Sequence, residues 1–219
     1  MIDPSWSRIY LFAANRGNVM RVKTDERRSA ILEAAAQVFR EEGYDRASMS
    51  MIAERVRGSK MTLYSYFPSK EELFWAAMVD AVSAQRGEKV LAILDSSEPD
   101  VAKVLRDFGE AYLRLFTARA AIAITRTAVS EGAANKALSS LLYNRGPKRV
   151  LDALTCYLAQ LQKKGLVCEL DPLIGAVQLK GLFDAGIVEP LLFGTRPELN
   201  QARAVEAAVS TFLRAYDSA

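Results

Sequence analysis

The chain has 219 residues, half of them hydrophobic, which is enough to bury the core of one large domain or of a small domain joined to a larger one. The formal net charge is only +3, so the position of the charges must indicate an anionic partner if there is one. The sequence contains no histidine, which excludes histidine triads and histidine metal sites. Cys156 and Cys168 lack a metal-binding spacing, so we expect reduced thiols, no metal and no cofactor.

The chain is expected to be cytoplasmic, because no apolar run approaches the roughly 20 residues of a membrane helix. Residues 1–22 are predicted to be an N-terminal extension, and because Met20 offers a second start, residues 1–19 are expected to lie outside the folded domain. A basic lead-in follows, formed by Arg21, Lys23, Arg27 and Arg28. Two interpretations of the lead-in stay open: an arm that enters a minor groove, or a solvated tail.

Four helices are expected in the first third of the chain: 25–42, 49–56, 60–66 and 70–81. Gly43 ends the first, and Pro68 cannot lie inside the third. Ser48, Ser59 and Ser69 are well placed to cap the other three. Three short helices, the second and third joined by a tight turn that contains glycine, predict a helix-turn-helix over residues 23–70.

The third helix, in "SKMTLYSYF", divides into two sides. Leu63 and Phe67 are four residues apart and are predicted to face the core. The outer side has small and polar groups that suit the major groove, where hydroxyls and ammonium groups donate to phosphates and Thr62 and Met61 meet base edges. The competing interpretation is an ordinary amphipathic helix whose outer side is solvated.

A family resemblance favours DNA binding. "AILEAAAQVFREEGYDRASMSMIAERV" followed by "GSKMTLYSYFPSKEELF" resembles the DNA-binding domain of the TetR family of transcriptional regulators, over residues 27 to about 78. The resemblance implies an all-α protein, a homodimer and a larger C-terminal domain that binds an effector. The candidate DNA contacts are Ser48, Arg57, Ser59, Lys60, Met61, Thr62, Tyr64, Tyr66 and Lys70.

The turn departs from the family pattern. The family usually has Gly-Val before Ser-Lys, whereas this chain has Arg57-Gly58. The turn is therefore expected to be looser, or Met49 and Met61 fill the space of the missing valine. Arg57 is either an additional phosphate contact or a solvated arginine.

Residues 71–219 are expected to form a helical effector-binding and dimerisation domain. Pro147 begins a helix that Gly165 ends, and two further helices are predicted at 172–189 and 197–216. "RTAVSEG…LYNRGPKRVLDALTCYLAQLQKKG" resembles the AefR-like subgroup. The last two helices carry apolar residues on more than one side, which favours burial against a second copy of the chain.

A small apolar effector is the expected ligand, because such pockets are mostly apolar with a few polar groups. The candidate pocket residues are Phe108, Tyr112, Phe116, Tyr143, Tyr157, Leu161 and Phe183, each of which alternatively fills the core. Arg126 and Glu131 are a buried ion pair, a ligand clamp or a surface pair. Gly175, Gly181 and Gly186 mark close helix approach, kinks or a cavity.

The prediction is a homodimeric repressor that binds a palindromic DNA operator and is released by a small molecule. The alternative is an architectural or nucleoid-associated DNA-binding regulator without an effector. No Gly-rich phosphate loop and no nucleophile elbow is present, so an enzyme is not expected, and neither is a membrane partner.

Overall fold

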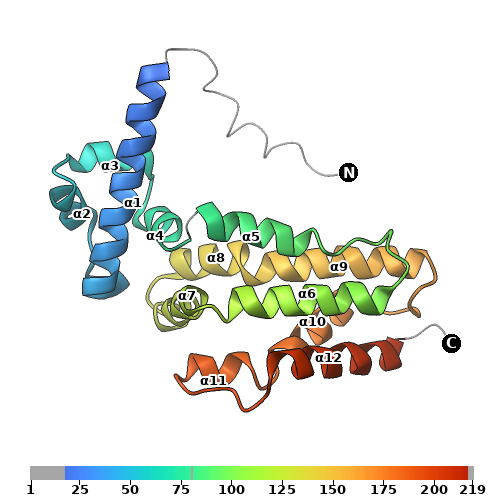
Figure 1. Ribbon diagram of the computed structural model, residues 1–219. Coiled ribbons are helices and arrows are strands. Elements are labelled where there is room, and N and C mark those ends of the chain that lie inside the picture. Colours follow the sequence, from blue (N-terminus) through green and yellow to red (C-terminus); the bar gives the residue numbers. More distant parts are fainter. Residues whose placement is uncertain (1–17, 80, 217–219) are drawn as a thin grey trace. The chain divides into compact units, whose positions relative to one another are not determined.

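In the computed structural model, which describes residues 18–79 and 81–216, the chain is helical and forms no strand (Figure 1). It divides into two compact units, one up to Ala77 and one from Met78 onward. The predicted all-α fold class is confirmed. Most of the predicted extension at residues 1–22 lies outside the described residues.

The first unit consists of four helices: α1 (Asn18–Arg46), α2 (Met49–Arg55), α3 (Lys60–Tyr66) and α4 (Lys70–Met78). α1 begins at Asn18, earlier than residue 25, so the basic residues predicted as a lead-in belong to a helix. Gly43 has φ 77°, a left-handed conformation that glycine adopts without strain, and it interrupts α1 where the sequence predicts a stop.

Side-chain caps position the next three helices. Backbone N–H groups of Met51 and Thr62 donate to the hydroxyls of Ser48 and Ser59, at 3.2 and 3.0 Å. The N–H of Glu72 donates to the Ser69 hydroxyl at 3.1 Å. All three predicted caps are confirmed, and each satisfies an N–H group that the helix itself leaves unpaired.

An aromatic cluster closes the core of the first unit. Phe74 of α4 meets Phe39 edge-on at 5.0 Å and Tyr44 at 5.2 Å, while Phe39 and Tyr44 stack at 5.9 Å. Leu73 beside it is fully buried. Since α4 contributes these side chains, the first unit extends to Ala77, beyond the predicted limit at residue 70.

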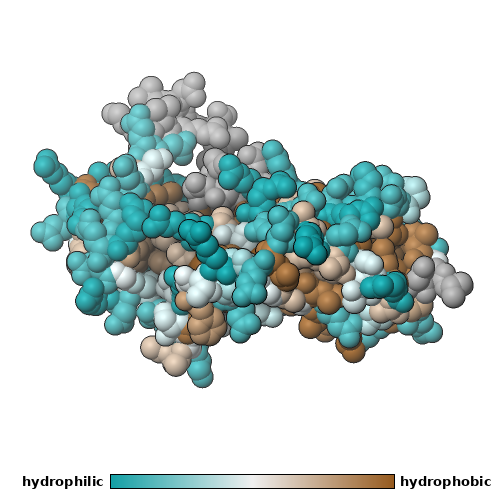
Figure 2. Space-filling view, turned by 60° about the horizontal axis from the view of Figure 1, so that its bottom comes forward, coloured by the Kyte–Doolittle hydropathy of each residue, from teal (hydrophilic) through white to brown (hydrophobic). Residues whose placement is uncertain are grey.

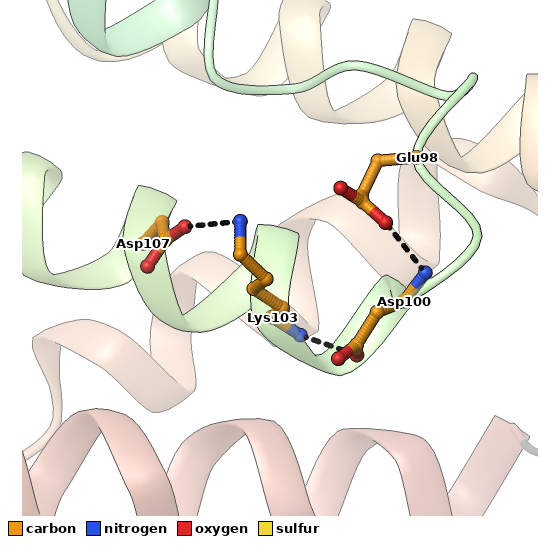
Figure 3. Close-up of polar contacts among 4 residues, drawn as sticks. All are labelled: Glu98, Asp100, Lys103 and Asp107. Atoms are coloured by element: carbon orange, nitrogen blue, oxygen red, sulfur yellow. Dashed lines mark hydrogen bonds and ion pairs between the residues drawn. The ribbon is translucent and has the colours of Figure 1, made fainter.

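The second unit contains eight helices within the described residues: α5 (Ala81–Leu91), α6 (Val101–Phe116), α7 (Arg119–Ser130), α8 (Lys136–Arg145), α9 (Pro147–Lys163), α10 (Pro172–Asp184), α11 (Val188–Leu192) and α12 (Gln201–Tyr216). Figure 3 shows how α6 begins: the Asp100 carboxylate accepts from the N–H of Lys103 at 2.8 Å, and the N–H of Asp100 donates to Glu98. One turn further, Lys103 pairs with Asp107 at 3.1 Å (Figure 3).

The core of this unit lies between α6, α9, α10 and α12. Gly109 permits the close approach of α6, because a Cβ there would lie 2.6 Å from the Phe183 ring and 3.0 Å from Val205. Gly165 has φ 69° directly after α9, as the predicted stop at that position requires.

The helix limits near the C-terminus differ from the prediction. The helix predicted at 172–189 ends at Asp184, because Gly186 turns the chain with φ 70°. Pro190 does not follow a helix but lies in the first turn of α11, where its missing N–H costs no hydrogen bond. The helix predicted at 197–216 begins at Gln201, where the Asn200 side chain accepts from the N–H of Ala202 at 2.9 Å.

Candidate nucleic-acid interface

α3 presents one buried and one open side, as its spacing predicts. Leu63 is fully buried and Phe67, at the C-cap, is 4% exposed. On the other side, Met61 is 82% and Tyr64 46% exposed, and Lys60 is also open to solvent. Such a short helix gains little stability alone, so its inner side chains fix it to the unit and leave the outer side free for contacts.

The N-terminal turn of α3 is internally bonded. The hydroxyls of Ser59 and Thr62 lie 2.8 Å apart and share a hydrogen bond, in addition to the cap at the N–H of Thr62. Tyr66 and Thr62 are half-buried. This network holds the Thr62 hydroxyl in one place while its methyl group and the exposed Met61 remain beside it.

The turn before α3 contains a residue with an unusual backbone conformation. Arg57 has φ 49° and is the one non-glycine residue with positive φ among the described residues. A Cβ on the next residue, Gly58, would lie 2.5 Å from the guanidinium of Arg27. Of the two residues predicted to fill the space of the missing valine, Met49 is buried and Met61 is not.

Two further predicted contacts, Lys70 and Ser48, also have structural partners. The Lys70 ammonium donates to the carbonyl of Asp45 at 3.1 Å and lies 4.2 Å from the centre of the Tyr44 ring. Ser48 caps α2. Each group retains further hydrogen-bonding capacity, since an ammonium has three donors and a hydroxyl has both a donor and acceptors.

Charge is distributed unevenly over the first unit. Residues 25–77 contain eight arginines and lysines and nine acidic residues, yet the stretch from Arg55 to Lys70 contains no acid. Arg55 pairs with Glu41 at 2.7 Å, whereas Arg57 and Lys60 form no ion pair with another described residue. The turn and α3 therefore concentrate positive charge in a unit that is close to neutral.

Two arginines of α1 were assigned by the sequence only to the lead-in. Arg28 lies 5.3 Å from the centre of the Phe67 ring, at the C-terminal end of α3, and the side chain of Arg27 lies over Gly58. The sequence shows Arg27 and Arg28 as an adjacent basic pair. Only the packing of α1 places them beside the turn between α2 and α3.

The predicted pocket residues of the second unit are mostly core. Phe108, Tyr112, Tyr157, Leu161 and Phe183 are at most 2% exposed. Phe116 packs beside them, with its ring 4.6 Å from that of Tyr112. Tyr143 stands apart, half exposed on α8.

Two buried hydroxyls differ in their partners. The Tyr112 hydroxyl donates to the Asp184 carboxylate at 2.7 Å, and Lys180 binds the other oxygen at 2.5 Å. Burial, followed by the charge of Asp184, raises the pKa of Tyr112 above its ordinary value. No described group bonds the buried hydroxyl of Tyr157, whose pKa is raised by burial and by the charges of Asp95 and Glu98.

The pair of Lys180 and Asp184 was not predicted, although a spacing of four residues in a helix favours an ion pair. Arg126 has partners that the sequence did not predict. Its guanidinium donates to the carbonyls of Leu191 and Leu192, at 2.7 and 2.9 Å, and so caps the C-terminal end of α11.

Within residues 18–79 and 81–216, no helix is both long and apolar enough to cross a bilayer. The same part of the chain holds no cluster of three or more Cys, Asp or Glu side chains arranged to bind a metal ion.

Comparison with known proteins identifies the class. Residues 31–77 match the family of bacterial regulatory proteins of the tetR type, and residues 103–218 match the AefR-like transcriptional repressor C-terminal domain. The second match covers more than half of the chain, so the chain belongs to the TetR family of transcriptional regulators, as the sequence motif indicates.

Curated relatives are similar at the DNA-binding end. The HTH-type transcriptional activator FasR of Mycolicibacterium smegmatis is 48% identical over 63 residues, which are 29% of this chain and 28% of FasR. The nicotine-responsive repressor HdnoR of Paenarthrobacter nicotinovorans is 32% identical over 79 residues, 36% of this chain and 40% of HdnoR. The matched region thus spans at most two fifths of these relatives.

Solved structures match over most of the chain. The flavonoid-responsive regulator FrrA has a TM-score of 0.75 and 28% identity, covering 88% of this chain and 98% of FrrA. A TetR-family transcriptional regulator from Mesorhizobium loti has a TM-score of 0.73 at 22% identity, covering 92% of this chain and all of the other. The latter likeness concerns the fold alone.

Proposed function

We propose that the protein is a cytoplasmic, homodimeric repressor of transcription that leaves its operator when a small molecule binds the second unit, and that it is not an enzyme. The observation that carries the proposal is the outer side of α3, which is exposed, free of acidic residues and continuous with the unpaired charges of Arg57 and Lys60. Positive charge next to hydroxyls and an apolar side chain suits a DNA groove better than a solvated surface.

In this proposal α3 enters the major groove, where some of its residues contact base edges and others contact phosphates. Met61 and Thr62, in the first turn, meet base edges. Lys60, Tyr64 and Tyr66 bind phosphates and set the orientation of the helix. The remaining proposed contacts are Ser48, Arg57, Ser59 and Lys70, which flank α3 at the turn and at the starts of α2 and α4.

Two copies are needed to place α3 in successive major grooves, about 34 Å apart on a palindromic operator. The exposed apolar residues of α10, together with α12, supply a surface for a second copy. The AefR-like C-terminal domain, described as that of a transcriptional repressor, supports repression rather than activation.

The effector is proposed to be a largely apolar molecule that enters the aromatic core around Tyr112 and Phe183. The unpaired hydroxyl of Tyr157 is available to bond a polar group on such a molecule. FrrA, a flavonoid-responsive regulator, makes flavonoids the first class to screen. A coupling of about 1–3 kcal/mol between effector and DNA would suffice for release.

The proposal is tested by selecting operators from genomic DNA with the purified protein and by titrating the Tyr64→Ala variant on the selected site. We expect at least about a tenfold loss of affinity, because a hydrogen bond to a charged group contributes about 1.5–3 kcal/mol. Tyr143→Ala is the matched control, since Tyr143 is similarly exposed but lies in the second unit.

Equal affinity of the Tyr64→Ala variant and the unaltered protein would remove α3 from the interface. Specific DNA binding that no small molecule releases would instead favour the architectural regulator, which is controlled by its abundance alone.

A further inference from the structure

α10 carries an apolar stripe that the other described residues leave about half exposed. Leu173, Ile174 and Val177 are 54%, 55% and 51% exposed. Gln178 and Gly181 continue the same side of the helix, because residues three, four and seven apart lie along one line. Figure 2 brings forward the side that carries α10 to α12 in Figure 1 and shows hydrophobic surface gathered on the second unit.

Gly181 differs from the neighbouring glycines because no described residue requires a glycine there. A Cβ on Gly175 would lie 2.3 Å from Leu170, and Gly186 has φ 70°. At Gly181, in the interior of α10, no atom lies within 4 Å of the place of a Cβ. Glycine weakens a helix interior, and no contact among the described residues offsets that cost at Gly181.

The space above Gly181 is a hollow between α10 and α12. Its volume is about 420 Å³, and it is lined by Gln178, Gly181, Leu182, Thr211, Phe212, Ala215 and Tyr216. The side chains of Tyr216 and Gln178 are hydrogen-bonded to each other across it. The lining is mostly apolar and has no side chain at Gly181, which suits an aliphatic side chain from outside.

We propose that a second copy of this chain fills the hollow, with Ile174 of each copy seated over Gly181 of the other. Ile174 and Gly181 are seven residues apart and lie on the same line of α10. If two α10 helices cross antiparallel about a twofold axis between Val177 and Gln178, the two positions are equally far from the axis. Each Ile174 then meets the partner's Gly181, twice per dimer.

A parallel arrangement of the two helices would not do this. It would place Ile174 against the partner's Ile174 and leave both glycines facing empty space, which wastes packing contacts. The antiparallel arrangement makes the stripe complementary to itself. The inference rests on the proposed homodimer and adds its helix register, which would restrict pairing to chains that carry the same isoleucine and glycine.

The test is an exchange of the two residues in the full-length protein, with the dimer dissociation constant measured by sedimentation equilibrium. Gly181→Ile fills the hollow and Ile174→Gly removes the side chain that occupies it. Each single change is expected to raise the dissociation constant of the dimer by about tenfold or more. The reason is that the contact between Ile174 and Gly181 occurs twice in each dimer, so one substitution disturbs it at two places. The double variant Ile174→Gly/Gly181→Ile places the same two shapes in reversed order and is expected to return within about tenfold of the original value.

Val129→Gly is the matched control: Val129 is 73% exposed on α7 and its removal should leave the dimer unchanged. Circular dichroism establishes that each variant is folded. Two weakened single variants without recovery in the double variant would overturn the register but leave the dimer standing. A monomeric unaltered protein would overturn the proposed dimer itself.

Discussion

Arg57 combines a backbone conformation that suits glycine with a side chain that suits DNA. An L-residue in the left-handed region costs about 1–2 kcal/mol, and Arg57 has φ 49°. We predict that Arg57→Gly raises the free energy of unfolding by about 0.5–1 kcal/mol, since glycine removes the strain but loses more entropy on folding. The same change should weaken operator binding, because the unpaired guanidinium is lost. Urea denaturation and a mobility-shift titration measure the two effects.

Two further substitutions at this residue separate strain from charge. Arg57→Asn removes the charge, and asparagine tolerates positive φ, so it should resemble Arg57→Gly in both measurements. Arg57→Lys keeps both the charge and the strain and should change neither. If Arg57→Gly and Arg57→Asn bind the operator as tightly as the original chain, Arg57 is only a solvated side chain.

The caps of α3 and α4 are chemically alike but lie in different surroundings. Ser59 and Ser69 each accept from a backbone N–H, at 3.0 and 3.1 Å. Aspartate caps a helix about as well as serine, so Ser59→Asp and Ser69→Asp should leave the unfolding free energy within about 0.5 kcal/mol of the original. Ser59→Asp should nevertheless abolish operator binding, because it places a carboxylate at the end of α3 that faces phosphates.

Alanine completes this comparison at the level of the helix. Ser59→Ala should cost about 1 kcal/mol of stability through the lost cap while retaining part of the DNA affinity. Ser69→Asp adjoins the proposed phosphate contact Lys70 and is therefore expected to weaken operator binding less than Ser59→Asp does, and an equal loss from both variants would mean that the N-terminus of α3 is not singled out by DNA.

Local chemistry explains which helices could be predicted from the sequence. α2 and α3 have a serine cap, a short run of helix-forming residues and a stop, so their limits follow from a few neighbours. α11 depends on a distant contact, because Arg126, more than sixty residues away, caps its C-terminal end. The start of α12 depends on a local cap that was not predicted from the sequence: Asn200 places it at Gln201 instead of at residue 197. The partners of Tyr112 and the separate position of Tyr143 were likewise set by packing, which no local pattern encodes.

Over the whole molecule, the charge balance makes the affinity for DNA depend on a few side chains. The net charge of +3 and the near-neutral first unit provide little long-range attraction. Under the proposed function, binding is therefore expected to come from local contacts between phosphates and the residues around α3. Each phosphate neutralised by such a residue releases counterions and adds about 0.9 to the slope of log K against log salt.

This slope can count the copies of α3 on the operator. Lys60 is exposed at the start of α3 and forms no ion pair with another described residue, so Lys60→Ala removes one phosphate contact from each bound copy. We predict that the slope falls by about 1.8 for the complex of a dimer, whereas a single bound copy would give about 0.9. Titrations of a fluorescent operator between about 50 and 200 mM salt measure it. Lys136→Ala, on α8 of the second unit, should leave the slope unchanged, and an equal effect of both lysines would mean that general charge rather than the α3 contact determines binding.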